Sequence, residues 1–434
     1  MVGEFPEDPS QVPCNAQTYV YLGDIARDGC RWDEAREAYA KALDLNPTLS
    51  EIWVQYGHAL KETSFTDAAE GAYKKALHLN PDVADTHLQL GHLLKIKGRR
   101  REAVTAYCEA LARDHSMRDA RAELRFLAHD KELALFVRQS AAAVGLDLDK
   151  QFRCVILGTM GMCNASCIHC PANKPVTGHV PKTPMPMWLF DKIVGSLAED
   201  EYDVGVQVSF GLFGDGLLDP HVEERARKLR KALPLVRLSV NTNAAAYNQA
   251  RHAPLADYVS MIAVHVESLH PETYDALMLP LRFNRVFPKI EQILRDFPGK
   301  VAISIPANRL NMHELSVMRE RFLEWGAIYV SFDRLSNRCS RDRQVFDSLS
   351  LGAKRGRCNG SALDDLIVDC DGKVLVCCND FERLEPVGDF TTESLLEIVR
   401  SARRRQMRFL LDSEKWDAIS TCSHCFADGS ISGS

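Results

Sequence analysis

A 34-residue period governs the first third of the chain. It repeats in "TYVYLGDIA…DEAREAYAKALDLNP", "IWVQYGHAL…TDAAEGAYKKALHLNP" and "THLQLGHLL…REAVTAYCEALARDH". The aligned positions are Gly23, Gly57 and Gly91, Ala35, Ala69 and Ala103, Tyr39, Tyr73 and Tyr107, and Ala42, Ala76 and Ala110. Small residues let two helices approach closely, and a tyrosine fills the space between them. The period therefore predicts stacked helical pairs, which bury their apolar faces only against neighbouring pairs.

Residues 16–117 resemble the tetratricopeptide repeat (TPR) family in period and signature positions. The resemblance implies an α-solenoid of three repeats within a domain at 1–148, and segment 117–130 is expected to add a capping helix. Such a solenoid binds a protein partner or a substrate tail, or it acts as a spacer or self-association module. The repeats are also similar to those of bacterial glycosyltransferase and polysaccharide proteins.

From about residue 150 the pattern changes to short β-rich runs separated by helical stretches. The runs are "FRCVILGT", "VGVQVSFGLF", "VRLSVNTN", "YVSMIAVHVE", "KVAISIP" and "AIYVSFDRL". Strands that alternate with helices predict a parallel α/β architecture. In such folds the chemistry lies in loops at the carboxyl ends of the strands.

Three cysteines in a C-x3-C-x2-C spacing, Cys163, Cys167 and Cys170, follow the first of these strands. A structural zinc site needs four ligands, and a disulfide framework needs an even count. A [4Fe–4S] cluster normally has one thiolate on each of its four irons. Three thiolates would leave one iron open, as a catalytic zinc keeps one position open. A zinc site or unconnected free thiols is the alternative.

The cysteine loop after a first strand resembles the radical S-adenosylmethionine (SAM) superfamily. The resemblance implies a partial (βα)6 TIM-like barrel, here at residues 149–345, and a cluster whose open iron is chelated by the amino and carboxylate groups of SAM. It also implies homolytic cleavage of SAM, after which a 5′-deoxyadenosyl radical abstracts a hydrogen atom from the substrate. The overall fold class expected is therefore α plus α/β.

Further positions are similar to the SAM-binding segments of that superfamily. In "FGDGLLDP" Gly214 and Asp215 correspond to the glycine-rich segment that holds the SAM amino group, with aspartate in place of glutamate. In "NTNAAA" Asn243 falls near SAM, followed by alanine where the family has glycine. In "AVHVESLHPETYDAL" His265 and Glu267 fall at ribose or substrate contacts. The alternative for each is a polar group at a strand end that only makes hydrogen bonds within the protein.

The tail carries four more spaced cysteines, Cys358, Cys377, Cys422 and Cys425. The "DCDGKV" segment predicts an Asp-Gly turn between two short strands, a β-hairpin that returns Cys377 towards Cys358. The C-x13-G-x4-C spacing and final C-x2-C resemble the Twitch domain, the shorter relative of the SPASM domain, at residues 346–434. The resemblance implies one fully ligated auxiliary [4Fe–4S] cluster for electron transfer. Zinc held by the same thiolates is the alternative.

Cys339 follows the last barrel strand, on the side where an active site is expected. Radical epimerases of similar architecture use a cysteine to return a hydrogen atom, and Cys339, Cys370 or Cys378 could serve as that donor. An ordinary free thiol is the alternative for each.

The composition argues against several classes of protein. The net charge of −6 gives no reason to expect nucleic-acid or membrane-surface binding, and no apolar run approaches the length of a membrane span. The acidic N-terminus is unlike a signal peptide, so we expect a cytoplasmic protein whose 14 cysteines are thiols or metal ligands.

These resemblances imply a radical SAM oxidoreductase or epimerase, and the single-cluster Twitch arrangement and the repeats favour a carbon of a sugar or glycan as its target. The resemblance also implies an external electron donor such as flavodoxin or ferredoxin. A peptide or protein maturase, which forms crosslinks or thioethers or epimerises residues, is the first alternative. A non-catalytic TPR scaffold is the second.

Overall fold

The computed structural model describes residues 15–128, 130, 132–200, 202–355 and 361–428. The chain divides into two compact units, residues 1–148 and 149–434. Cys14 and Cys358 lie outside the described residues. No helix in these ranges is both long enough and apolar enough to cross a membrane.

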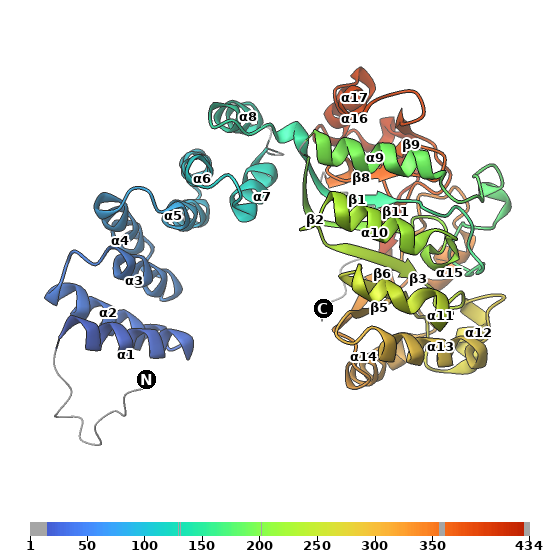
Figure 1. Cartoon of the computed structure of the whole chain (residues 1–434), viewed down its shortest axis with the longest axis horizontal. Helices are drawn as coiled ribbons and strands as arrows, with labels where there is room; N and C mark the ends of the chain where they lie inside the picture. The colour runs from blue at the N-terminus through green and yellow to red at the C-terminus, as the bar shows by residue number, and fades with distance from the viewer. Residues whose placement is uncertain (1–14, 129, 131, 201, 356–360, 429–434) are drawn as a thin grey trace. The chain divides into compact units, whose positions relative to one another are not determined.

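The first unit consists of helices in consecutive antiparallel pairs, followed by two shorter helices (Figure 1). This arrangement confirms the predicted solenoid and the helix expected near residues 117–130. The helices are α1 (Ala16–Asp28), α2 (Trp32–Leu45), α3 (Ser50–Glu62), α4 (Thr66–Leu79), α5 (Ala84–Ile96), α6 (Arg100–Arg113), α7 (Arg118–Leu127) and α8 (Ala134–Ala143).

Within each pair a glycine of the first helix receives the tyrosine of the second. A Cβ added at Gly57 would lie 2.6 Å from Cε1 of Tyr73, and the equivalent distances in the other two repeats are 2.4 and 2.5 Å. The three tyrosines are fully buried. Only a residue without a side chain allows this approach, which explains why glycine and tyrosine recur together.

The second unit is built on a nine-stranded sheet in the order β10-β9-β8-β1-β2-β3-β4-β5-β6. Strands β1 to β6 run parallel to their neighbours in sequence order, which confirms the predicted partial barrel. The strands are β1 (Gln151–Leu157), β2 (Asp203–Phe210), β3 (Leu238–Thr242), β4 (Met261–His265), β5 (Val301–Ala307), β6 (Tyr329–Arg334), β7 (Ala353–Arg355), β8 (Leu366–Val368), β9 (Lys373–Leu375), β10 (Pro386–Asp389) and β11 (Phe426–Asp428).

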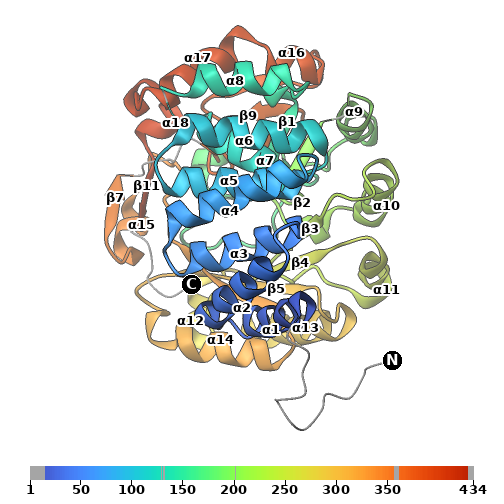
Figure 2. The same cartoon turned by 90° about the vertical axis from the view of Figure 1, so that its left-hand side faces the viewer.

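Helices connect the parallel strands, and α9, α10 and α11 follow one another along one side of the sheet (Figure 2). The strands are rich in valine, isoleucine and leucine and largely buried, as parallel strands covered by helices require. The helices are α9 (Met187–Glu199), α10 (Val222–Ala232), α11 (Gln249–His252), α12 (Pro271–Leu277), α13 (Phe283–Asp296), α14 (Leu315–Glu324), α15 (Gln344–Leu349), α16 (Leu395–Val399), α17 (Ala402–Asp412) and α18 (Ser420–Ser423).

The C-terminal strands extend the barrel sheet instead of forming a separate one. Strand β8 pairs in parallel with β1, and β9 and β10 follow in antiparallel order. The turn from β8 to β9 contains Gly372 with a φ of 91°, a backbone conformation that glycine adopts without strain. This hairpin is the one predicted from "DCDGKV". A two-stranded sheet of β7 and β11 brings residues 426–428 next to residues 353–355.

Candidate active site

The loop after β1 carries three cysteines whose side chains line one cavity of about 290 Å³. Asn173 holds the loop: its φ is 63°, and its Nδ2 donates to the carbonyl oxygens of Cys163 at 2.8 Å and Ala165 at 2.7 Å. The N–H of Ala165 also lies 3.4 Å from Sγ of Cys163. The structure therefore brings Cys163, Cys167 and Cys170 to one wall, at the carboxyl ends of the strands.

The three thiols interact with one another in a poorly hydrated environment. Burial raises the pKa of Cys163 to about 12, and the charge of Asp215 adds to this effect. Burial likewise raises the pKa values of Cys167 and Cys170. Thiols with raised pKa values release their protons when a cation replaces them, so metal binding here is coupled to proton release. Three adjacent soft ligands fit an iron–sulfur cluster.

Asp215 joins the ends of β2 and β3 beside this loop. Its buried carboxylate accepts from the N–H of Leu217 at 2.9 Å, the N–H of Asn243 at 2.7 Å and the Thr242 hydroxyl at 2.9 Å. Burial raises the pKa of Asp215, and these donors partly offset the rise. Asp215 lines the cavity, and it also positions the segment that carries Asn243.

Asn243 reaches back to the cysteine loop. Its Nδ2 donates to Oδ1 of Asn164 at 2.8 Å and lies 3.7 Å from Sγ of Cys163. Gly214 lies against the same loop, since a Cβ there would be 2.2 Å from the carbonyl oxygen of Met160. Asn243 and Gly214 both line the cavity, so the sequence-predicted segments after β1, β2 and β3 meet there.

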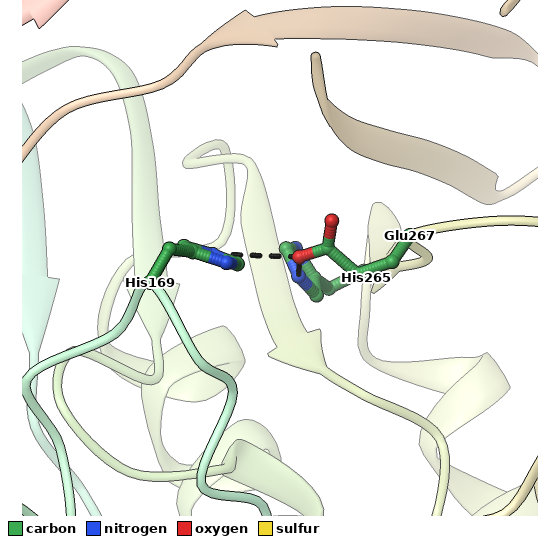
Figure 3. A group of neighbouring side chains, drawn as sticks. All are labelled: His169, His265 and Glu267. Carbon is green, nitrogen blue, oxygen red and sulfur yellow. Dashed lines mark hydrogen bonds and ion pairs between the residues drawn. The ribbon is translucent and has the colours of Figure 1, made fainter. Parts of the chain in front are cut away.

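His265, which is partly exposed, and the buried Glu267 form a polar group with the buried His169, a residue of the cysteine loop (Figure 3). Oε1 of Glu267 lies 3.0 Å from Nε2 of His265 and 3.4 Å from Nε2 of His169. Burial lowers the pKa of His169 to about 4, so this ring is neutral at pH 7. Burial opposes ionisation of Glu267, but the adjacent His169 and His265 lower its pKa overall. His265 and His169 line the cavity, whereas Glu267 is fully buried and holds both rings.

Three residues that the sequence analysis did not single out belong to the site. Arg338 lines the cavity from the loop after β6, and its guanidinium lies 5.6 Å from the ring centroid of Phe381. His169 and Asn173 act through the contacts given above. The position of His169 between two of the cavity cysteines was a usable signal, whereas Arg338 is recognisable only once the loop is placed in space.

A second group of thiols lies in the C-terminal part of this unit. The thiol of Cys339 contacts those of Cys377 and Cys425, and the thiol of Cys378 contacts that of Cys377. Contact with Cys377 is the largest cause of a raised pKa at Cys339. The N–H of Asn379 lies 3.4 Å from Sγ of Cys377, the same arrangement as at Cys163.

Three cysteines were predicted as possible hydrogen donors at the active site. None of them is among the described residues that line the cavity; they are Cys339, Cys370 and Cys378. Cys370 is buried with its sulfur 3.7 Å from the carbonyl oxygen of Pro181. The predicted ligand Cys358 lies outside the described residues.

Comparison with solved structures gives distant likenesses for each unit. A crystal structure of BtrN in complex with AdoMet and 2-DOIA is 16% identical, with 63% of this chain and 92% of that chain covered and a TM-score of 0.45. Native anSMEcpe with bound AdoMet is 14% identical, with 62% and 88% covered and a TM-score of 0.45. MamA is 24% identical, with 31% and 81% covered and a TM-score of 0.29.

Comparison with family profiles is more direct. No curated protein sequence matches the chain. Residues 16–49 and 84–115 match tetratricopeptide repeats. Residues 358–426 match SPASM, described as an iron–sulfur cluster-binding domain, over the segment that contains the tail cysteines. The chain therefore carries N-terminal tetratricopeptide repeats and a C-terminal SPASM-type iron–sulfur cluster-binding domain.

Proposed function

We propose that this protein is a radical SAM enzyme that oxidises or epimerises a carbon of a sugar or glycan. The observation that carries the proposal is the convergence of Cys163, Cys167 and Cys170 on one cavity with Asp215 and Asn243. All five lie at the carboxyl ends of parallel strands, where such folds place their chemistry. The adjoining match to an iron–sulfur cluster-binding domain supports redox chemistry in the same unit.

The three thiolates would hold a [4Fe–4S] cluster with one iron free to bind SAM, and such a cluster supplies a 5′-deoxyadenosyl radical for hydrogen abstraction. Asn243 and the backbone around Gly214 offer polar contacts for SAM on the wall next to the cysteine loop. Asp215 holds these two segments together through its bonds to the end of β3.

The remaining cavity groups suit a hydroxyl-bearing substrate. Glu267 accepts the Nε2–H of His265 and thereby leaves Nδ1 of that ring as a proton acceptor for a substrate hydroxyl. Arg338, Ser304 and Asn241 supply further polar contacts along the cavity. In an oxidation, a cluster in the SPASM-type domain would accept the second electron. An external donor such as flavodoxin or ferredoxin would supply the electron that starts turnover.

Peptide or protein maturation is the second candidate, and the tetratricopeptide repeats favour it. Such repeats present a concave surface that binds peptides in extended or helical form. In this case the same cavity would act on a residue of a bound chain. The repeats would then raise the affinity for substrate without touching the reacting carbon.

The first test is cleavage of SAM by anaerobically reconstituted, chemically reduced protein. The wild type is expected to form 5′-deoxyadenosine, and Cys163→Ala is expected to form none. Cys154→Ala, a substitution of a buried cysteine on β1 that does not line the cavity, is the matched control. Absence of product from wild type and control alike would reject radical chemistry and favour a non-catalytic scaffold.

The second test separates the two substrate classes and the two outcomes. Candidate sugars, glycans and peptides are supplied with deuterium at carbon, and transfer of deuterium into 5′-deoxyadenosine identifies the class attacked. Reactions with unlabelled substrate in D2O then distinguish the products. An epimerised product contains one solvent-derived deuterium at carbon, whereas an oxidised product contains none and has lost two hydrogens.

A further inference from the structure

Cys339 lies at a point where three distant segments of the chain meet. It follows β6 in the loop 335–341, and it is 3% exposed. Its thiol is in direct contact with the thiols of Cys377, after β9, and Cys425, before β11. Cys425 closes a tight turn with Cys422, whose carbonyl oxygen accepts the Cys425 N–H at 3.1 Å.

The segment of Cys422 and Cys425 is tied to the Cys339 loop by a dense set of hydrogen bonds. Nδ2 of Asn337 donates to the carbonyl oxygens of Ser340 at 2.9 Å and His424 at 2.6 Å. Oδ1 of Asn337 accepts from the N–H of Phe426 at 2.9 Å, and the backbones of the same two residues pair at 2.9 Å. These bonds fix the distance between the Cys339 and Cys425 backbones.

Glu382 ties the same loop to the segment of Cys377. Its buried carboxylate accepts from the Ser340 hydroxyl at 3.1 Å and from the N–H of Arg341 at 2.9 Å. Nε of Arg341 donates to the other oxygen at 2.7 Å. Cys339 itself has a φ of 53°, a left-handed conformation that is unfavourable for a residue with a side chain. Bonds on both sides hold the thiol in place despite this cost.

We infer that Cys339 is a ligand of the iron–sulfur cluster of the SPASM-type domain, together with Cys377, Cys422 and Cys425. The sequence motif assigns the fourth position to Cys358, so in this chain Cys339 would take that position. A thiolate bound to iron carries no S–H, so the assignment replaces the role of hydrogen donor expected for Cys339. The inference rests on the family match at residues 358–426 and not on radical chemistry at the cavity.

The test compares Cys339→Ala, Cys358→Ala and the control Cys154→Ala in anaerobically reconstituted full-length protein. Wild type and control are expected to bind about eight irons per chain, four in each cluster. Cys339→Ala is expected to bind about four, and Cys358→Ala about eight. The electron paramagnetic resonance signal that SAM perturbs should remain in every variant, because the cavity cysteines are untouched.

Cys339→Ser is a second variant that separates the loss of a cluster ligand from a folding defect. An oxygen ligand in place of sulfur is expected to keep the chain folded, to weaken iron retention and to change the resonance signal of the auxiliary cluster. Full iron content with an unchanged signal in both Cys339 variants would overturn the inference. Loss of about four irons in Cys358→Ala would also overturn it, since the motif cysteines would then fill every position. Failure of the proposed radical chemistry would instead appear as a missing SAM effect in wild type.

Discussion

The backbone N–H of Asn243 donates a 2.7 Å hydrogen bond to Oδ2 of Asp215, and this bond joins the carboxyl ends of β3 and β2 inside the candidate site. Asp215 is 3% exposed, and its partners are all donors. An ionised carboxylate accepts hydrogen bonds on both of its oxygens and donates none, so both its charge and its shape suit these donors.

Asp215→Asn is expected to destabilise the second unit by about 2 kcal/mol. The NH2 group of the asparagine would replace one carboxylate oxygen and face another hydrogen-bond donor in a buried site. The affinity for SAM should also fall, since the segment of Asn243 loses its anchor. Urea unfolding and equilibrium binding of SAM measure the two effects. Asp191→Asn, which breaks a partly exposed pair with Lys228, should cost less than about 0.5 kcal/mol. Equal costs in the two variants would contradict this account.

Asn173 provides a separate prediction about the cysteine loop. Asn173→Asp keeps the side-chain shape but replaces both donated hydrogen bonds with a carboxylate facing two carbonyl oxygens. We expect lower iron retention at the cavity cysteines and a loss of about 2 kcal/mol in stability. Iron analysis after gel filtration measures retention. Asn80→Asp is the control, because Asn80 only accepts, from the N–H of Asp82 at 3.4 Å. Unchanged iron in Asn173→Asp would show that the loop is fixed by other contacts.

Local patterns in the sequence predicted much of this structure. The repeat period predicted the helical pairs because the contact between Gly57 and Tyr73 is made within one repeat, and each of the other repeats has the equivalent contact. The alternation of strands and helices predicted the parallel α/β arrangement of β1 to β6, in which each strand lies beside the next one in sequence. The Asp-Gly turn predicted the hairpin of β8 and β9 because its geometry depends on adjacent residues.

Long-range packing determined the features that the sequence did not predict. The pairing of β8 with β1 depends on which barrel edge is free, and no local pattern carries that information. The contact between Cys339 and Cys377 depends on loops that Asn337 and Glu382 fix from two sides. The position of Cys339 after the last barrel strand therefore suggested a hydrogen donor at the active site or an ordinary free thiol, whereas the structure places it among other thiols.

The glycine–tyrosine contact of the repeats yields a matched pair of substitutions in one repeat. Gly57→Ala places a Cβ 2.6 Å from a buried ring, and we expect a loss of about 2 kcal/mol as the helices separate. Gly71→Ala, within α4, meets no atom within 4 Å and should gain about 0.5–1 kcal/mol from its higher helix propensity. Thermal unfolding followed by circular dichroism measures both. Similar shifts in the same direction would refute the packing argument.

His252 makes the stability of the second unit depend on pH. This fully buried ring accepts the N–H of Asn248 at its Nδ1, at 3.0 Å, and burial lowers its pKa from 6.5 to about 4. Between these two values the unfolded chain binds a proton that the folded chain does not bind. Stability is therefore complete above pH 6.5 and falls as the pH decreases towards 4, by about 3 kcal/mol from this residue.

His252→Gln removes the titrating group and keeps a side-chain acceptor for Asn248. The variant is expected to be less stable than wild type at pH 7, and the difference should shrink by about 3 kcal/mol as the pH falls towards 4. Urea unfolding at a series of pH values, followed by tryptophan fluorescence, measures the difference. His78→Gln, on the exposed side of α4, controls for the loss of a histidine as such. A constant difference across the series would mean that the folded chain protonates His252 as readily as the unfolded chain, and the ring would then have access to water that its burial excludes.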